Sequence, residues 1–445
     1  MSTIKEKTIK QYVDTDYRAF WKECNQAKNT FFATEQITAI ERHVLFAGHE
    51  LHMRAGDHHK TVALGGETSK YHMSSNDGIM EFVKMLAQNY RREPAARVLY
   101  PIGNLGDSPD NHGAAARYTS VGGTPLAASV ISDMDFCDWQ FDSRMAVNMP
   151  SKLSYPFPPA LINGYHQVGV GHSNILASRS CKDIIDYLEA RFVHNDASAP
   201  VPAPNSINGC LVLPINSKGY ITYRAKWHNE GEYDVITALP PRIKISQVLA
   251  KLKTKIPPVQ YNKVFDGSGE DAPVRLMIPT GVIDEMFKTG QAYTCGFETY
   301  LREQIFIWDE DIDTMRGATI PEIAKLWFDG RKVVLTRKLN ATIDKLTKES
   351  AKIDLIREFV KRGMIKKSQK EIEEVFGKDN TNILLSMPAK TFLPENLGKQ
   401  DLRQEAVNKD IEMWRGKLEH IDAYVIEVAR AVAKANEDFF AELDA

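Results

Sequence analysis

Residues 100–121 of the chain have the sequence YPIGNLGDSPDNHGAAARYTSV. The glycines and prolines predict loops and short strands, and near the end of the stretch Arg117 directly precedes Tyr118. A phenol has a pKa of about 10, so a tyrosine that attacks phosphorus must be activated by its surroundings. An adjacent guanidinium can hold a phosphate and stabilise the charge that builds on it. By itself, however, an Arg-Tyr pair is more often two ordinary residues of a surface loop.

The composition is that of a globular protein with several domains. The chain has 445 residues, of which 43% are hydrophobic and 26% charged, and this length predicts two to four domains. No apolar run approaches the roughly 18 residues that span a bilayer, and the N-terminal MSTIKEKTIK lacks the apolar core of a signal peptide. The five cysteines are scattered and form no CxxC pair, which indicates reduced thiols and a cytoplasmic location.

The charge balance does not favour an independent nucleic-acid surface. The net charge is −2, and residues 42–118 hold 9 basic and 8 acidic side chains. A duplex bound near Tyr118 would therefore need a further surface, which we expect a partner to provide.

Periodicity predicts a mixed α+β organisation. Amphipathic helices are expected over 34–53 and 78–90, and the Pro- and Ala-rich residues 195–207 predict an extended connector. Beyond the connector, alternation predicts an α+β domain. Its expected strands are 219–227, 234–239 and 274–278, and its expected helix is 245–252.

The last 120 residues predict long helices. Apolar residues mark one helix from Val334 to Ile356, and a second set recurs in alternating steps of three and four, as in a coiled coil. This second set is Ile411, Trp414, Leu418, Ile421, Val425, Val428 and Val432. Residues 331–370 hold 13 basic and 4 acidic side chains, whereas 401–445 hold 6 basic and 11 acidic ones. Opposite charges favour an antiparallel hairpin with its tip at 363–400, and two solvated helices of a bundle are the alternative.

Six of the twelve histidines lie within a stretch of thirty residues. They are His43, His49, His52, His58, His59 and His72. The spacing from His49 to His52 is not that of a HExxH zinc site, and no cysteine supports a metal cluster. Histidines that lie on the surface or face a phosphate are the better interpretation.

Two further stretches suit contact with a phosphate backbone. Lys70, His72, Ser74 and Ser75 lie just before the second predicted helix, where donors could meet a phosphate oxygen, although an ordinary N-cap loop fits as well. Residues 155–171 end in GVG, and glycines there permit close approach of another chain or a nucleic acid. A β-branched residue presented there could wedge between base pairs, and a buried strand is the alternative.

Taken together and in order, these segments resemble the breakage-reunion part of type IIA DNA topoisomerases. The resemblance covers nearly the whole chain. The matching segments are RHVLFAGHEL (42–51), GGETSKYH (65–72), YPIGNLGD (100–107), AAARYTSV (114–121), FPPALINGYHQVGVGHSNI (157–175) and LLSMP (384–388). Within this family the length is closest to that of the medium subunit of T-even-type phage topoisomerases.

The resemblance implies an α+β multidomain fold. Residues 1–30 would be an N-terminal arm, and 31–155 a winged-helix DNA-cleavage domain that carries the catalytic tyrosine. Residues 156–320 would be an α+β tower domain. Residues 321–445 would be a long antiparallel coiled coil with a C-terminal dimer gate and its tip near 363–400.

The resemblance also implies a mechanism and site residues. Tyr118 would form a transient 5′-phosphotyrosyl link in each strand, and Arg117 would hold the phosphate. His72 and Lys28 complete the expected catalytic set. Serine replaces a second histidine that the family has after KYH, and Lys28 replaces an arginine. The DNA-binding set is Lys70, Asn104, Val168, Asn163, Ser74 and Ser75, in which Val168 aligns with the intercalating residue.

The same resemblance implies partners. No metal ligand is assigned to this chain, and it has no Walker A motif. A large subunit with ATPase and metal-binding domains would therefore bind the ATP and most of the Mg²⁺. Double-stranded DNA and a second copy of the chain are the other expected partners. If the chain is phage-encoded, the expected location is the host cell cytoplasm.

Two other functions remain open on the sequence. A non-catalytic DNA-binding or architectural protein could keep the same fold, and a different phosphoryl-transfer enzyme such as a recombinase could use the same tyrosine.

Overall fold

The computed structural model describes residues 6–26, 30–269 and 272–443. It divides into two compact units, one formed by Met1–Arg331 with Ile426–Ala445 and the other by Lys332–Val425. Within the described ranges, no helix is long and apolar enough to cross a membrane. All five cysteines are described and all are free thiols, as their scatter predicted.

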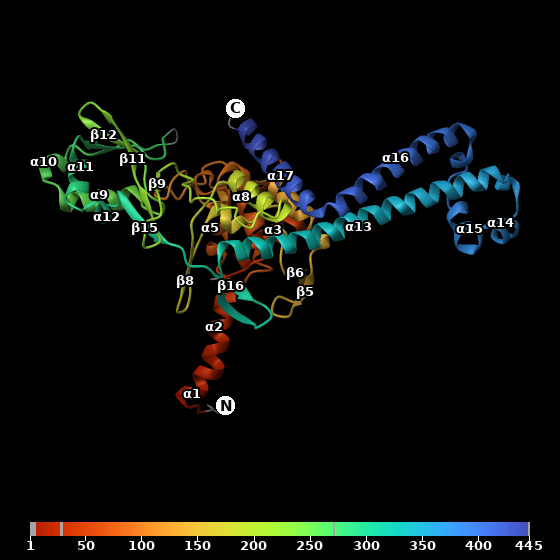
Figure 1. The fold of residues 1–445 in the computed structure, drawn as a ribbon, viewed down its shortest axis with the longest axis horizontal. Helices are drawn as coiled ribbons and strands as arrows, with labels where there is room; N and C mark the ends of the chain where they lie inside the picture. The colour runs from red at the N-terminus through yellow and green to blue at the C-terminus, as the bar shows by residue number, and fades with distance from the viewer. Residues whose placement is uncertain (1–5, 27–29, 270–271, 444–445) are drawn as a thin grey trace. The chain divides into compact units, whose positions relative to one another are not determined.

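A small antiparallel sheet with neighbouring helices forms the first part of the larger unit (Figure 1). Its strand order is β2-β4-β3, and the central strand β4 starts two residues after Tyr118. The strands are β2 (His58–Lys60), β3 (Leu99–Ile102) and β4 (Ser120–Gly123). The helices are α3 (Ala39–Glu50), α4 (Thr61–Thr68), α5 (Asn76–Ala87) and α6 (Pro125–Ser132).

Local signals set the ends of the two predicted helices in this region. The helix expected over 34–53 is confirmed but shorter, since α3 is followed by His52 with a left-handed φ of 55°. The helix expected over 78–90 begins earlier, because the Ser75 side chain accepts a hydrogen bond from the Gly78 amide at 3.2 Å. Ser75 is thus the helix N-cap, as the alternative interpretation of this loop has it.

Short elements connect this region to the middle of the chain. The N-terminal helices lead to β1, which pairs in parallel with β16. The elements are α1 (Ile9–Tyr12), α2 (Arg18–Cys24), β1 (Phe31–Phe32), β5 (Trp139–Asp142), β6 (Val147–Pro150), α7 (Pro159–Asn163), β7 (Tyr165–Val168), β8 (Ser173–Leu176), α8 (Cys181–Leu188), β16 (Phe306–Asp309) and β17 (Thr314–Gly317).

The middle of the chain contains both strands and helices, as predicted, and the connector 195–207 contains no helix or strand. The expected strand 219–227 is two strands in different sheets, because the chain leaves one sheet at Ala225 and enters the next. One sheet is β9 (Leu211–Leu213), β10 (Tyr220–Arg224) and β15 (Glu298–Arg302), and the other is β11 (Lys226–Glu230), β12 (Tyr233–Ala238), β13 (Phe265–Asp266) and β14 (Leu276–Pro279). The helices here are α9 (Ile245–Lys255), α10 (Pro258–Tyr261), α11 (Val282–Lys288) and α12 (Ala292–Cys295).

Three buried charges tie the segment Leu153-Ser154-Tyr155 to two distant parts of the chain. The carboxylate of Glu35 accepts from the Leu153 amide at 2.9 Å, and that of Glu41 accepts from the Tyr155 hydroxyl at 2.9 Å. The Arg331 guanidinium donates to the Ser154 hydroxyl at 2.8 Å. Each charge has an ionic partner, and these pairs are Glu35–Arg42, Glu41–Arg92 and Arg331–Asp133. The segment therefore fixes α3 and the start of the long helix to one point.

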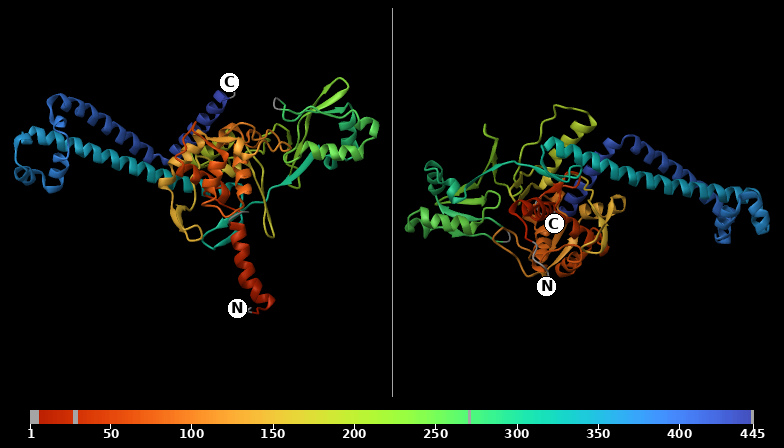
Figure 2. Two further views of the ribbon diagram at one scale, coloured as in Figure 1. Left: turned by 180° about the vertical axis from the view of Figure 1, so that it is seen from behind. Right: turned by 90° about the horizontal axis from the view of Figure 1, so that it is seen from below.

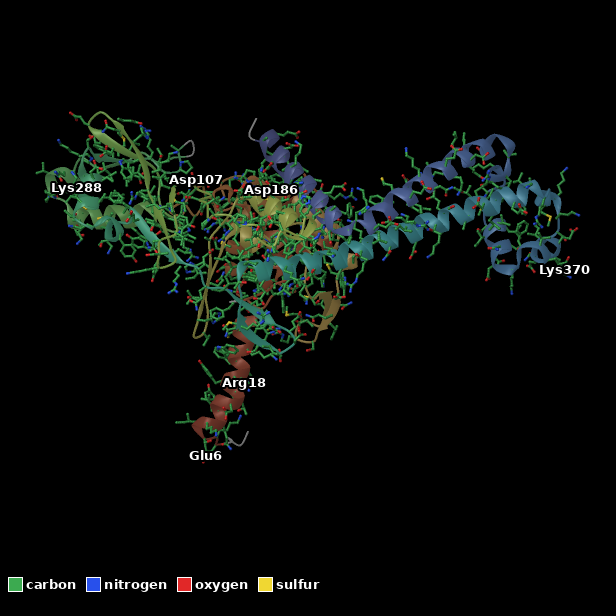
Figure 3. All side chains as sticks on the ribbon, viewed as in Figure 1. Glu6, Arg18, Asp107, Asp186, Lys288 and Lys370 are labelled. Atoms are coloured by element: carbon green, nitrogen blue, oxygen red, sulfur yellow. The ribbon has the colours of Figure 1, made fainter. Side chains whose placement is uncertain are left out.

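The last helix of the chain packs on the domain that carries Tyr118. Asn436 is fully buried, donates to the Arg97 carbonyl at 2.9 Å and accepts from the Leu126 amide at 3.0 Å. Asp186, labelled in Figure 3, accepts from Arg430 at 2.9 Å. The C-terminal residues 426–443 are thus part of the larger unit, although they follow the second unit in the sequence.

The second unit contains two long antiparallel helices and a small helical cap. Ion pairs from Arg357 to Asp401 (2.9 Å) and from Arg403 to Glu349 (2.6 Å) fix the antiparallel direction. The apolar residues from Ile411 to Val432, predicted as one coiled-coil repeat, are divided between two helices, because the chain leaves helical geometry at His420. Side-chain spacing selects an apolar face, and it does not require an unbroken backbone. The helices are α13 (Ile320–Lys361), α14 (Gln369–Phe376), α15 (Lys378–Leu385), α16 (Pro394–Glu419) and α17 (Ile421–Leu443), of which α13 and α17 extend into the first unit.

Replacing Glu41 with leucine tests the buried network. Glu41→Leu leaves the Arg92 charge buried without its partner, which should lower the free energy of unfolding by about 3–5 kcal/mol. The double variant Glu41→Leu/Arg92→Leu should regain part of this loss. Urea denaturation followed by circular dichroism measures both, and Glu322→Gln, in a partly exposed ion pair, is the control with a loss below about 1 kcal/mol. Equal losses in the single and the control variant would refute the network's role.

Candidate functional site

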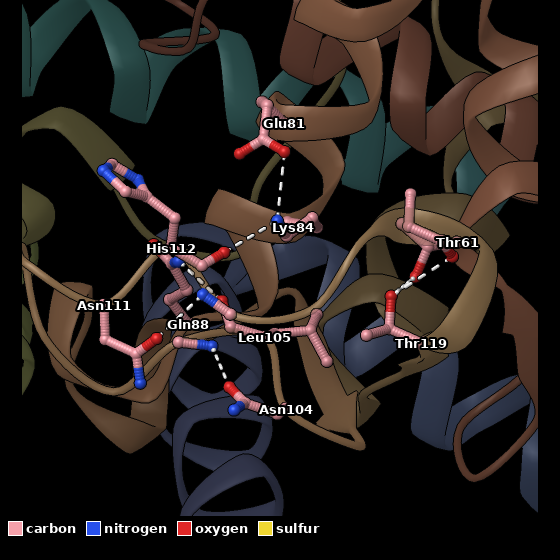
Figure 4. Close-up of polar contacts among 12 residues, drawn as sticks. Thr61, Glu81, Lys84, Gln88, Asn104, Leu105, Asn111, His112 and Thr119 are labelled. Carbon is pink, nitrogen blue, oxygen red and sulfur yellow. Dashed lines mark hydrogen bonds and ion pairs between the residues drawn. The ribbon is translucent and has the colours of Figure 1, made fainter. Parts of the chain in front are cut away.

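Arg117 and Tyr118 lie on a short 3-10 turn, η5 (Ala116–Tyr118), directly before strand β4. Tyr118 is 67% exposed, and the guanidinium carbon of Arg117 lies 4.7 Å from the centre of its ring. The turn is held by the next residue, because Thr61 donates its amide to the Thr119 carbonyl at 3.1 Å and the two threonine hydroxyls lie 2.8 Å apart (Figure 4). The Tyr118 phenol is therefore exposed to solvent beside the Arg117 guanidinium.

The loop before this turn is held by helix α5. The buried ammonium of Lys84 donates to the His112 carbonyl at 2.8 Å and pairs with Glu81 at 3.0 Å (Figure 4). The Gln88 side chain donates to the Leu105 carbonyl at 2.8 Å. Burial of a charged lysine is costly unless such partners are present, so Lys84 fixes the loop geometry.

Two tight approaches shape the same loop. The side-chain oxygen of Asn104 accepts a hydrogen bond from the Gly106 amide at 3.0 Å, and the backbone carbonyl of Asn104 accepts one from the Ala114 amide at 2.8 Å. A side chain at Gly113 would lie 2.4 Å from the carbonyl carbon of Leu105, and Gly113 has a left-handed φ of 67°. Asn104 therefore has a structural role in the turn, which leaves its amide group at the loop surface.

His72 belongs to a pair of histidines that the sequence did not single out. It follows α4, and its Nδ1 lies 3.1 Å from Nδ1 of His43 on α3. Burial, with the charges of Arg42 and His72, lowers the pKa of His43 to about 3, while Asp142 acts in the opposite sense. His43 is therefore neutral at physiological pH, so it can share a hydrogen bond with His72 without charge repulsion.

The other predicted residues of this region have local partners. Lys70 pairs with Glu67 at 2.6 Å, and the Tyr71 hydroxyl bonds the same carboxylate at 2.7 Å. Ser74 is exposed, and its amide donates to the His72 carbonyl at 3.0 Å. Lys28 lies outside the described residues.

Strands β7 and β8 form a hairpin (Figures 1 and 2), and Val168 is the last residue of β7, paired with Ser173 beside the turn. Its side chain is 72% exposed, which is unusual for a β-branched apolar residue, and the buried-strand alternative is therefore wrong at this position. Asn163 lies at the end of α7, just before the hairpin, and its buried Oδ1 accepts no hydrogen bond from any described residue.

The fold brings some predicted residues together and separates others. The turn η5 contacts β2, α4 and α5, and the segment with Lys70 and His72 connects α4 to α5. Asn163 and Val168 belong to other elements, α7 and β7. Within the ranges that the structure describes, no three His, Cys, Asp or Glu side chains come together in a way that could hold a metal ion.

The sequence analysis named His43 only as one of six clustered histidines, and it did not name Lys84 or Gln88, which also shape the site. Lys84 and Gln88 are four residues apart in a helix, which places them on one side. That spacing was a usable signal, although only the fold shows that the loop lies there. His43 had no local signal, because its contact is with a residue 29 positions away.

Comparison with known sequences shows to which class of protein this chain belongs. The sequence pattern of the A-type subunits of DNA gyrase/topoisomerase IV matches residues 39–430, and the chain belongs to this family. It is 25% identical over 358 residues to the A-type subunit of DNA topoisomerase 4 from Neisseria gonorrhoeae, a match that covers 69% of this chain and 46% of that protein.

Two DNA gyrase proteins, also A-type subunits, are similar at the same level. The one from Haloquadratum walsbyi is 24% identical over 243 residues, which are 50% of this chain and 28% of the relative. The one from Campylobacter fetus is 23% identical over 359 residues, which are 73% of this chain and 40% of the relative. The chain thus spans less than half the length of these curated relatives.

The pKa of His43 predicts an acid-dependent loss of stability. Its folded-state pKa of about 3 lies below the unfolded value near 6.5, so the unfolded chain binds the extra proton as the pH falls. His43 therefore lowers the free energy of unfolding below pH 6.5, by up to about 1.4 kcal/mol per pH unit. In His43→Gln, urea denaturation at pH 6.5, 5.5 and 4.5 should give a shallower dependence. The same slope in both proteins would contradict this assignment.

Proposed function

We propose that this chain is the DNA-cleaving and rejoining subunit of an ATP-dependent type II DNA topoisomerase. The observation that carries the proposal is the exposed Arg117-Tyr118 turn, held by the Thr61–Thr119 contacts, in a chain of the DNA gyrase/topoisomerase IV family of A-type subunits. The relatives' names, which are those of DNA topoisomerase 4 and DNA gyrase, support the same reaction class.

The chemistry follows from the phenol. The Tyr118 oxygen attacks a backbone phosphorus, the bond from phosphorus to the 3′ oxygen breaks, and the proton lost by the phenol is balanced by protonation of the 3′ oxygen. The product is a 5′-phosphotyrosyl link and a free 3′-hydroxyl, formed in each strand so that a second duplex can pass. Because a phenolate is a better leaving group than a sugar alkoxide, the 3′-hydroxyl can attack the link and restore the strand.

The remaining site residues surround this reaction in the proposal. Arg117 holds the non-bridging oxygens of the scissile phosphate, as its place beside the phenol suggests. His72, oriented by His43, donates to the same phosphate, and Lys28 adds charge. The proposed DNA contacts are those of Lys70, Asn104, Ser74, Ser75, Asn163 and Val168.

A partner subunit completes the proposed enzyme. Magnesium in such reactions neutralises charge on the transferring phosphate. The described residues of this chain do not fit a magnesium site, since they bring no three suitable side chains together. We assign the Mg²⁺ and the ATP mainly to a large subunit with metal-binding and ATPase domains, and no step above runs through either group.

The proposed architecture follows the family resemblance. Residues 31–155 act as a winged-helix cleavage domain after the arm 1–30, residues 156–320 as a tower, and 321–445 as a coiled coil with a dimer gate. Two copies of the chain form the proposed core. The chain is proposed to be the medium subunit of a T-even-type phage topoisomerase, which acts in DNA replication in the host cell cytoplasm.

Replacing the nucleophile tests the proposal. Wild-type chain with its partner subunit, magnesium and plasmid should, on denaturation, yield protein joined to the 5′ ends of linear DNA. Tyr118→Phe removes the attacking oxygen, so adducts should fall at least about a hundredfold, while the affinity for duplex should change little because one hydroxyl is lost. Arg117→Lys keeps the charge but loses the fork and should slow adduct formation about tenfold to a hundredfold.

Tyr293→Phe, at another exposed tyrosine, is the matched control and should form adducts as the wild type does. A wild-type chain that never forms a 5′-linked adduct under these conditions would leave the non-catalytic DNA-binding protein as the function.

A further inference from the structure

We propose that Trp21 is a positioning residue that holds the Val168 hairpin in place as a wedge for duplex DNA. This inference rests on the proposed function, in which the substrate is duplex DNA. It adds a residue of the N-terminal arm to the residues proposed to act on that DNA. The indole Nε1 of Trp21 donates to the Val170 carbonyl at 3.0 Å, two residues beyond the exposed Val168. The contact joins positions 149 residues apart, so local structure does not produce it.

A wedge at this tip needs external support. The hairpin consists of two strands of four residues, β7 and β8, and an isolated two-stranded hairpin is marginally stable in water. Prising two base pairs apart costs a few kcal/mol, which a side chain can supply only if its backbone does not yield. The turn itself contains Gly169 and Gly171, and Gly171 has a left-handed φ of 84°. Glycines make such a turn possible but do not stiffen it.

Strand β8 and the end of the turn before it are held by the segment before and within β16. The fully buried Asn174 donates to the Phe306 carbonyl at 2.7 Å and accepts from the Phe306 amide at 3.2 Å. Ile175 and Gln304 exchange two backbone hydrogen bonds of 2.8 Å. The ring of His172 packs edge-on against Phe306, with 5.3 Å between ring centres. These contacts fix β8 and the His172 end of the turn, and they leave the other end of the turn, next to Val168, to be held from the other side.

The end of helix α2 provides that second support. Lys22 forms an ion pair with Asp313, next to β17, and Glu23 pairs with Arg144, between β5 and β6, at 2.8 Å. Trp21 therefore acts from a helix end that is itself tied to two other elements. Its indole N–H reaches the tip, where the two supports converge.

The packing between helix end and tip leaves no spare room. A Cβ at Gly169 would lie 2.2 Å from Cε1 of His172 and 2.8 Å from Oδ1 of Asn25. Cβ atoms do not make non-bonded contacts this short, so a side chain at position 169 does not fit beside His172 and Asn25 in this arrangement. The hairpin is thus clamped between the arm and β16, with the Val168 side chain as its exposed point.

A bending assay tests the role of Trp21. The full chain, together with its partner subunit and magnesium, is bound to a 30-base-pair duplex with a fluorophore at each end, and energy transfer reports the ratio of bent to straight complexes. Trp21→Phe keeps an aromatic ring but removes the donor, and this ratio should fall about fivefold, the effect of one lost hydrogen bond. Val168→Ala should lower it further. Phe20→Leu, at an exposed neighbour on the same helix, is the matched control and should bend DNA as the wild type does.

A duplex already kinked by a two-base bulge separates positioning from folding. Because the kink is supplied in advance, Trp21→Phe should bind and bend this duplex as the wild type does. Equal losses on intact and kinked duplexes would show that Trp21 only supports folding and would overturn the proposal. Wild-type bending by Trp21→Phe on the intact duplex, with straight complexes for Val168→Ala, would overturn the role of Trp21 but keep the wedge.

Full bending by Val168→Ala, or no bending by the wild type, would overturn the wedge itself. The 5′-linked adduct of Tyr118 is measured separately and decides whether the proposed cleavage function stands in that case.

Discussion

Three buried charged side chains that converge on Leu153-Ser154-Tyr155 are the constraint on which the larger unit depends. A charge taken out of water is strongly destabilising unless an ionic partner and hydrogen bonds surround it. Glu35, Glu41 and Arg331 each have both, and they come from two distant parts of the chain, the region around the start of α3 and the helix α13. Because these geometries must be met together, they fix helix α3 and the start of α13 against one segment. His43 lies on α3, and the turn with Tyr118 contacts α4 and α5, which both pack on α3.

The candidate site combines an exposed phenol, that of Tyr118, with hydrogen bonds that hold the segments on either side of it. Tyr118 projects from a turn between a held loop and the central strand β4, with Arg117 over its ring. The loop is fixed by a buried lysine, Lys84, and the turn by paired threonine hydroxyls. Reactive groups on loops that a scaffold positions are a common solution, because the loop gives access and the scaffold gives precision. The support proposed for Val168 follows the same logic at a second place.

The sequence predicted the elements better than the contacts. Helices α3 and α5 and the mixed strands and helices of the middle region followed from periodicity, and the opposite charges predicted for the two arms agree with the ion pairs between α13 and α16. The seam of the last region was predicted as one repeat, but it is divided at His420 between two helices. Apolar spacing selects a face of a helix and leaves the path of the chain open.

The sequence by itself determined the secondary structure, the order of the motifs and, through them, the family and the identity of Tyr118 and Arg117 as the residues to examine. Those properties depend on neighbours within a few positions, which a linear reading contains. Only the tertiary structure decided that His43 faces His72, that Lys84 holds the loop before Tyr118, and that Trp21 reaches the Val168 hairpin. These contacts join distant positions, and they exist because packing and the pairing of buried polar groups must be satisfied for the whole domain at once.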